Sequence, residues 1–215
     1  MYDVTVVTNT KRHMSMLRSY TPADALTVAN AACGTIGIFL CLESLASGQL
    51  GLLWAVCLLL GLALVFDVLD GYVARLDRRR QSRLGADLDS LSDVISFGVA
   101  PAVLGYTLGL RGGWDMLCLT YFVVCGVSRL ARFNVTAPAL ADASTGKVKY
   151  FEGTPIPSSI LIVALLAVAM SQGRIGEDLW LGVVRIGPAA LHPLALVYAA
   201  SGSAMISATL KIPKP

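Results

Sequence analysis

Residues 51–75 read GLLWAVCLLLGLALVFDVLDGYVAR, an apolar run that ends in two aspartates and an arginine. The stretch 51–66 contains no charged side chain, and Asp67 and Asp70 follow before the run closes at Arg75. An α-helix needs about 20 apolar residues to cross the hydrocarbon core of a bilayer. We therefore expect a membrane-spanning helix here, with two carboxylates near one of its ends.

The composition of the whole chain agrees with a membrane protein. The chain has 215 residues, of which 55% are hydrophobic and 14% are charged, whereas soluble domains carry about 25% charge. The net charge of +3 does not indicate nucleic-acid binding, because the basic residues flank apolar runs and form no polar face. We predict an all-α, polytopic protein that forms a single domain over residues 1–215, with a polar N-terminal segment at 1–22 and six transmembrane helices at approximately 23–45, 50–75, 86–109, 114–132, 156–173 and 186–209.

The basic residues predict the orientation. Of the 17 Lys and Arg residues, all but Arg111, Arg174 and Arg185 fall on one side of the six predicted spans. Cytosolic segments are enriched in Lys and Arg, so both termini are expected in the cytosol. An even number of spans also requires both termini on the same side of the membrane. The longest polar connection is expected at about 135–154, on the cytosolic side.

Two pairs of aspartates fall near the cytosolic ends of neighbouring helices. Asp67 and Asp70 are three residues apart, and Asp89 and Asp93 are four apart, so each pair shares one helix face. With a rise of 1.5 Å per residue, both pairs lie on the order of 6–12 Å below the cytosolic helix ends. The two helices are antiparallel neighbours, so the four carboxylates are expected to meet at one level.

Four carboxylates in apolar helices need a compensating partner. Inserting one aspartate at the centre of a membrane helix costs about 2.5–3.5 kcal/mol of free energy, and less near the interface. Divalent cations prefer carboxylate oxygens, and a pair of metal ions is a common apparatus for attack on a phosphoryl group. The alternative is a set of solvated interfacial aspartates, which would leave the shared faces and depth as coincidence.

The spacing of these residues resembles a known family. The pattern D-G-x2-A-R followed by G-x3-D-x3-D is the signature of the CDP-alcohol phosphotransferases. Here it reads Asp70-Gly71-x2-Ala74-Arg75 and then Gly85-x3-Asp89-x3-Asp93. The nine residues between Arg75 and Gly85 exceed the seven or eight usual in the family. The extra residue is expected in the loop, where an insertion is tolerated.

The resemblance implies a role for each signature residue. Two divalent cations, Mg or Mn, would be held by Asp67, Asp70, Asp89 and Asp93, and Asp93 would also be the general base. CDP would be contacted by Asp70, Gly71, Ala74, Arg75 and Gly85. The alternative for Gly71 and Ala74 is close helix packing, and Arg75 could simply mark the cytosolic boundary. The family also implies a homodimer.

Asn30 is a further candidate for the nucleotide site. It lies about seven residues in from the cytosolic end of the first predicted helix, near the depth of the aspartates. It could reach the cytidine of CDP or bond to a helix backbone.

Two further stretches bear on the acceptor alcohol. SRLARFNVT at 128–136 and KYFEGTPIPSS at 149–159 resemble the phosphatidylserine synthase branch of the family, in which R-L-A-R-F-N and F-x-G-x-P-x-P recur. A guanidinium suits the carboxylate of serine or a lipid phosphate. The residues predicted to bind serine or the lipid head group are Arg83, Arg129, Arg132, Asn134, Phe151 and Glu152. The alternatives are ordinary basic flanking for the arginines and a plain loop for Phe151 and Glu152.

The sequence therefore predicts transfer of a phosphatidyl group from CDP-diacylglycerol to L-serine, with release of CMP. Inositol, glycerol phosphate or another alcohol remains open as the acceptor. A cation transporter is the alternative from another class, although transporters place their ion sites near the bilayer midplane. The enzyme would lie in the endoplasmic reticulum membrane of a eukaryote or the plasma membrane of a bacterium.

Overall fold

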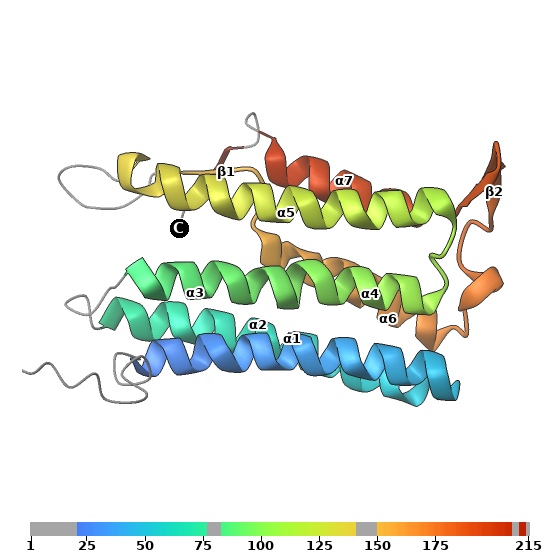
Figure 1. Ribbon diagram of the computed structural model, residues 1–215, viewed down its shortest axis with the longest axis horizontal. Helices are drawn as coiled ribbons and strands as arrows, with labels where there is room; N and C mark the ends of the chain where they lie inside the picture. The colour runs from blue at the N-terminus through green and yellow to red at the C-terminus, as the bar shows by residue number, and fades with distance from the viewer. Residues whose placement is uncertain (1–20, 77–82, 141–149, 208–210, 214–215) are drawn as a thin grey trace, which may run out of the picture.

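The computed structural model describes residues 21–76, 83–140, 150–207 and 211–213, and most of them are helical (Figure 1). The helices are α1 (Pro22–Ser47), α2 (Gly51–Leu76), α3 (Arg83–Asp93), the π-helix η3 (Val94–Val99), α4 (Ala100–Leu108), α5 (Gly113–Leu140), the 3-10 helix η4 (Ile156–Ser159), α6 (Ile160–Ser171), the 3-10 helix η5 (Gly176–Asp178) and α7 (Ala195–Ile206). Two antiparallel strand pairs join β1 (Tyr150–Glu152) to β4 (Lys211–Pro213) and β2 (Val184–Ile186) to β3 (Ala189–Leu191).

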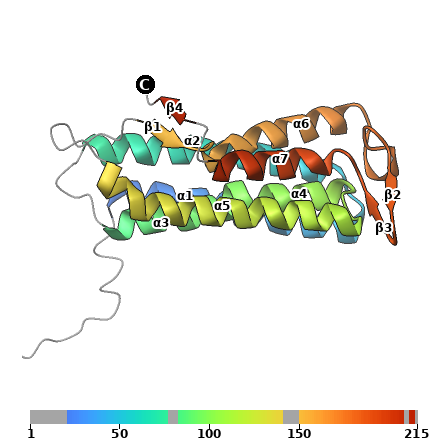
Figure 2. The same cartoon turned by 90° about the horizontal axis from the view of Figure 1, so that it is seen from above.

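The long helices run side by side along the long axis of the molecule (Figures 1 and 2). α4 continues the line of α3 through η3, so these three elements form one rod. The end of α2, the start of α3 and the end of α5 lie together at one end of the bundle. The β2–β3 hairpin lies at the opposite end, beyond α6 and α7. The bundle thus has two structurally distinct ends.

The ends of α1 are specified by local sequence. Thr21 accepts a hydrogen bond from the backbone N–H of Asp24, and the Asp24 carboxylate accepts one from the backbone N–H of Thr21. This reciprocal capping box satisfies donors that the first helical turn leaves unpaired. Gly48 closes the helix with a positive φ of 73°, a conformation that glycine adopts without steric cost. The chain then reverses into α2.

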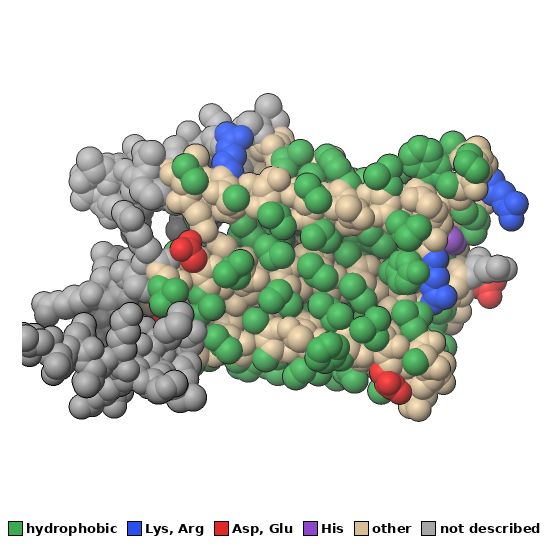
Figure 3. Space-filling view, in the orientation of Figure 1, with side chains coloured by type: hydrophobic (Ala, Val, Ile, Leu, Met, Phe, Trp, Pro, Cys, Tyr) green, Lys and Arg blue, Asp and Glu red, His purple; other side chains and the backbone are tan. Residues whose placement is uncertain are grey.

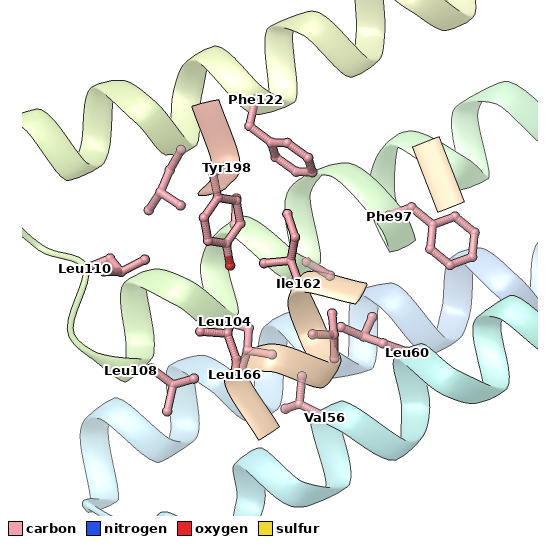
Figure 4. Packing of buried hydrophobic residues seen from close by; sticks show 14 of the residues in the cluster. Val56, Leu60, Phe97, Leu104, Leu108, Leu110, Phe122, Ile162, Leu166 and Tyr198 are labelled. Carbon is pink, nitrogen blue, oxygen red and sulfur yellow. The ribbon is translucent and has the colours of Figure 1, made fainter. Parts of the chain in front are cut away.

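A cluster of buried apolar side chains holds the bundle together near its middle (Figure 4). Tyr198 of α7 lies edge-on to Phe122 of α5, with ring centroids 5.3 Å apart. Its hydroxyl donates a 2.7 Å hydrogen bond to the carbonyl oxygen of Pro101. An edge-to-face pair adds about 0.5–1.5 kcal/mol beyond burial. These contacts connect α7 to both α4 and α5.

The outer surface is also apolar. Leu58, Val68 and Leu161 are each more than 60% exposed, and Figure 3 shows hydrophobic side chains over the middle of the molecule with charged ones at its ends. Four helical stretches among the described residues are long and apolar enough to cross a membrane, namely Pro22–Ser47, Gly51–Leu76, Leu84–Leu108 and Gly113–Thr136. The chain is therefore an integral membrane protein, and its exposed apolar belt faces lipid.

The third predicted helix is confirmed in its extent, with one unexpected feature, and the fourth needs correction. The stretch 86–109 is one continuous rod, but six of its residues, Val94–Val99, form a π-helix. α5 extends beyond the predicted end at 132 to Leu140. The expected polar connection at 135–154 therefore begins as helix. Hydropathy marks where a helix enters polar surroundings, which need not be where its hydrogen bonding ends.

The sixth predicted helix, at 186–209, was wrong in its first part. Residues 184–191 form the β2–β3 hairpin, and α7 begins at Ala195. Gly187 takes a φ of +63° at the turn, and Pro188 lacks the N–H that a helix would need. The flanking residues are apolar enough to resemble a helix by hydropathy, but the Gly-Pro pair breaks it. The two strand pairs also qualify the all-α prediction.

Candidate functional site

Three of the four predicted metal-binding aspartates meet between α2 and α3. One carboxylate oxygen each from Asp67, Asp89 and Asp93 lies within 4.8 Å of the other two. Asp93 is 5% exposed, whereas Asp67 and Asp89 are half-buried. Three carboxylates at this separation repel one another strongly when all are ionised. The cluster is therefore suited to bind positive charge.

Asp70 lies beside this cluster and is held from another helix. Its Oδ2 accepts a 2.6 Å hydrogen bond from the Thr27 hydroxyl of α1. Asp70 is 6% exposed and interacts electrostatically with Asp67, Asp89 and Asp93. Thr27 thus fixes one oxygen of the Asp70 carboxylate.

Asn30 approaches the same cluster from α1. Its Nδ2 lies 3.5 Å from Oδ1 of Asp93, a long donor contact, and its backbone carbonyl accepts a 2.8 Å hydrogen bond from Ser96 of η3. Its side-chain Oδ1 is buried and has no hydrogen-bond partner in the described structure. Asn30 is fully buried, so it lies behind the carboxylates.

The π-helix begins immediately after Asp93. The Cβ that an alanine at Gly34 would carry falls 2.8 Å from the Cα of Ser96, closer than real Cβ atoms approach a backbone. Glycine at this position therefore lets α1 and η3 pack directly together. π-helical turns are uncommon and are frequent at functional sites. Here the turn follows the deepest aspartate of the cluster.

α5 brings two of the predicted acceptor-binding residues to α3. Arg129 interacts electrostatically with Asp93, and its guanidinium carbon lies 5.5 Å from the centre of the Phe133 ring. Five residues further on, Asn134 donates a 2.9 Å hydrogen bond from Nδ2 to the hydroxyl of Ser90. The RLARFN segment is thereby aligned along the aspartate-bearing face of α3.

The predicted nucleotide-binding residues lie around the α2 end of the site. A Cβ added to Gly71 would meet no atom of the described residues within 4 Å, so among these residues nothing packs closely on the backbone there and it is open to a ligand. Ala74 and Gly85 are half-buried, and Arg75 is exposed in the last turn of α2.

Other predicted residues are less informative. Arg132 is exposed on α5. The side chains of Arg83, Phe151 and Glu152 lie outside the described residues, although the backbone of Arg83 opens α3 and that of Phe151 and Glu152 forms β1. Their predicted roles remain predictions.

Sequence reasoning missed three hydroxyl residues that contact predicted site residues. They are Thr27, Ser90 and Ser96. The sequence did contain a signal for Thr27, because small and polar residues recur every three or four positions along α1. The buried members of this series are Asp24, Thr27, Asn30, Gly34, Gly37, Cys41 and Ser44. Such a small and polar stripe within an apolar helix marks a face that packs on other helices.

The donor set fits a divalent metal ion. Hard cations bind carboxylate oxygens at about 2.0–2.6 Å, so two oxygens on the same ion lie at most about twice that distance apart. The separations between Asp67, Asp89 and Asp93 satisfy this limit. Together, the apolar belt and the acidic cluster define an integral membrane protein with an acidic site near one end of its helices.

Comparison with known proteins identifies the family. Residues 20–200 match the CDP-alcohol phosphatidyltransferase family, and the chain belongs to that family. It is 41% identical over 215 residues to a Saccharomyces cerevisiae CDP-diacylglycerol–serine O-phosphatidyltransferase, covering 99% of this chain and 78% of that one. It is 41% identical over 143 residues to an archaetidylserine synthase of Methanothermobacter thermautotrophicus, covering 66% of this chain and 55% of that one.

A bacterial relative extends the similarity. A CDP-diacylglycerol–serine O-phosphatidyltransferase of Mycobacterium tuberculosis is 36% identical over 169 residues, covering 74% of this chain and 52% of that one. The chain thus spans about half the length of the archaeal and bacterial relatives. Membership of a phosphotransferase family favours the enzyme over the cation-transporter alternative. Members of this family generally use divalent metal ions, and the aspartate cluster is suited to hold one.

Proposed function

We propose that this chain transfers the phosphatidyl group of CDP-diacylglycerol to the hydroxyl of L-serine and releases CMP. The observation that carries the proposal is the electrostatic interaction of Arg129 with Asp93, which brings a guanidinium from the RLARFN segment into Coulomb range of the acidic site. Relatives from a fungus, an archaeon and a bacterium are each named for transfer to serine or synthesis of a serine lipid. This agreement supports serine over inositol or glycerol phosphate.

We infer that Asp67, Asp89 and Asp93, together with Asp70, would hold two divalent cations, Mg or Mn. When bound, such ions neutralise the diphosphate and stabilise charge on the leaving group. Thr27 would keep the Asp70 carboxylate oriented through its hydrogen bond. Asn30 would support Asp93 from the buried side of the site.

Asp93 would act as the general base. The serine hydroxyl loses its proton to this carboxylate while its oxygen forms a bond to the phosphorus attached to diacylglycerol. The bond between that phosphorus and the oxygen of the departing CMP breaks, and CMP leaves with the electron pair. General-base assistance of this kind contributes typically about 10²–10⁴-fold in rate.

Substrate positioning would fall to residues around the cluster. Gly71 offers an open backbone surface to the nucleotide, and Ala74, Arg75 and Gly85 would complete the CDP site. Arg129 would receive the serine carboxylate. In this role it needs a fixed guanidinium, and stacking near the Phe133 ring limits its freedom.

The remaining proposals concern topology and assembly. The two shorter apolar helices, Ile156–Ser171 and Ala195–Ile206, would raise the number of membrane crossings to six, with both termini and the acidic site facing the cytosol. The membrane would be the endoplasmic reticulum in a eukaryote or the plasma membrane in a bacterium. We also infer a homodimer.

The deciding experiment measures CMP release by the purified full chain with CDP-diacylglycerol and one alcohol at a time. We expect release with L-serine, together with formation of phosphatidylserine, and little with inositol or glycerol phosphate. Arg129→Lys keeps the positive charge but removes the planar guanidinium that can bind a carboxylate through two hydrogen bonds. This variant should raise KM for serine about tenfold or more. Its KM for CDP-diacylglycerol should change little. Equal release with inositol or glycerol phosphate would contradict the assignment.

A further inference from the structure

A cavity lies at the end of the bundle away from the aspartates. Its volume is about 930 Å³, and its walls come from the end of α1, the end of α4, the turn at 175–176 and the β2–β3 hairpin. The acidic cluster sits at the opposite end, where α2 meets α3 (Figure 1). The cavity is therefore too distant to be part of the phosphoryl-transfer site.

The charged residues that line this cavity are basic. Arg111 and Arg185 both contribute to its walls, as does His192, and no carboxylate is among its described lining residues. Figure 3 shows basic side chains and a histidine at this end of the molecule, together with acidic side chains that are not among the described lining residues of the cavity. The rest of the lining includes apolar side chains, among them Leu45, Leu108 and Val183. The cavity thus combines positive charge with an apolar wall.

Arg111 is already fixed in place. Its Nε donates to the carbonyl oxygen of Tyr106 at 3.2 Å, and one terminal nitrogen donates to that of Thr107 at 3.1 Å. Its guanidinium carbon lies 5.7 Å from the centre of the Tyr106 ring. A guanidinium has five N–H donors, so donors remain for a ligand. Because the side chain is ordered beforehand, binding costs less conformational entropy.

The hairpin that carries Arg185 is also anchored. The buried Asp115 accepts hydrogen bonds from the backbone N–H of His192 at 2.7 Å and from that of Gly112 at 2.8 Å, and it lies 2.6 Å from Nδ1 of His192. Trp114 donates from Nε1 to the carbonyl oxygen of Ile186 at 3.0 Å. These contacts tie β2 and β3 to the start of α5, so the cavity wall is preformed.

The surroundings of the cavity indicate which anion it would take. Trp114 is 40% exposed next to the hairpin, and tryptophans concentrate at the level of the lipid head groups. Exposed Val184 and Ile186 continue the apolar surface along β2. A free phosphate would use the arginines alone, whereas a phospholipid would use both the arginines and the apolar wall.

We propose that this cavity binds the phosphodiester head group of an anionic phospholipid from the leaflet opposite the active site. Arg111 and Arg185 receive the phosphate oxygens, and the acyl chains leave along the apolar wall. The site is independent of the transfer reaction, since it shares no residue with the aspartate cluster.

The test titrates dihexanoyl phosphatidylglycerol into the purified full chain and follows tryptophan fluorescence. All three tryptophans, Trp54, Trp114 and Trp180, belong to segments that border the cavity end, so the signal reports on this end. We expect saturable binding, with Kd raised about tenfold or more by Arg185→Gln and by Arg111→Gln, as for the loss of a charge-assisted hydrogen bond. Arg174→Gln is the matched control, because Arg174 is exposed and does not line the cavity.

Arg185 is the decisive position, because it is exposed on the hairpin and its replacement should not affect folding, whereas Arg111 also pairs with the end of α4. An unchanged Kd in both variants would overturn the proposal. So would equally tight binding of zwitterionic dihexanoyl phosphatidylcholine. Inorganic phosphate that competes at the same concentration as the lipid would assign the cavity to a free anion and overturn the lipid assignment.

Discussion

Thr27 on α1 donates a 2.6 Å hydrogen bond to the Asp70 carboxylate on α2, and both side chains are buried. This bond joins the first helix to the acidic site across 43 residues of sequence. Aspartates at the end of an apolar helix have many rotamers open to them. A fixed hydroxyl donor selects one of these, and Asp70 is therefore oriented before any ligand arrives.

Thr27→Val tests this role, because valine keeps the shape of threonine and removes the hydroxyl. A hydrogen bond to a charged group contributes about 1.5–3 kcal/mol, so we expect kcat/KM to fall about 10- to 100-fold. The Mn²⁺ concentration that gives half-maximal activity should rise in parallel. Thr27→Ser should restore most activity. Thr35→Val is the matched control, since Thr35 bonds only to the carbonyl of Ala31 in its own helix among the described contacts.

Asp93→Asn should nearly abolish CMP release. The substitution keeps the size of the side chain and removes its capacity to accept a proton, so we expect a loss of at least about 10²-fold in kcat. Asp87→Asn is the control, because Asp87 is exposed on the same helix and outside the cluster. Equal losses in both variants, measured as CMP released from CDP-diacylglycerol, would argue against a specific role for Asp93.

Metal binding should stabilise the folded protein as well as activate it. In the absence of a cation, the carboxylates of Asp67, Asp89 and Asp93 lie within 4.8 Å and repel one another. A ligand that binds the folded state at 100 times its Kd adds about 2.7 kcal/mol of stability. We therefore expect Mn²⁺ to raise Tm and EDTA to lower it, as measured in detergent.

Asp89→Asn supplies the control for that measurement. It removes one ligand and part of the repulsion, so Tm without metal should stay the same or rise, while the increase on adding Mn²⁺ should shrink. An undiminished Mn²⁺ response would place the metal elsewhere.

Much of the site could be predicted from sequence, because it depends on short helical spacings. The i, i+3 and i, i+4 pairs on α2 and α3 place Asp67, Asp89 and Asp93 on facing surfaces, and the structure brings them together. Contacts across helices, such as Thr27 with Asp70, depend on how α1 is rotated against α2, which spacing within one helix does not specify. The β2–β3 hairpin was missed because hydropathy describes burial in lipid and does not distinguish helix from strand.

The π-helix was missed for a related reason. A π-turn has no hydropathy signature, since it changes which carbonyl accepts each N–H and leaves the side chains apolar. Its position depends on tertiary packing against α1, where Gly34 permits the close approach of Ser96.

Gly34→Ala should therefore disturb the acidic site without touching its carboxylates. The added Cβ would lie 2.5 Å from the Ser96 hydroxyl oxygen and 2.8 Å from its Cα, so η3 must move away from α1. Overpacking of this kind costs typically about 1–3 kcal/mol. Because η3 follows Asp93 directly, we expect both a lower Tm and a loss of CMP release.

Gly61→Ala is the matched control for this prediction. Gly61 also lies within a long apolar helix, but a Cβ there would meet no atom of the described residues within 4 Å. Alanine is favoured over glycine in a helix by about 1 kcal/mol, so this variant should retain activity and show an unchanged or higher Tm. If Gly34→Ala behaved like Gly61→Ala, close packing of α1 on η3 would not be what positions Asp93.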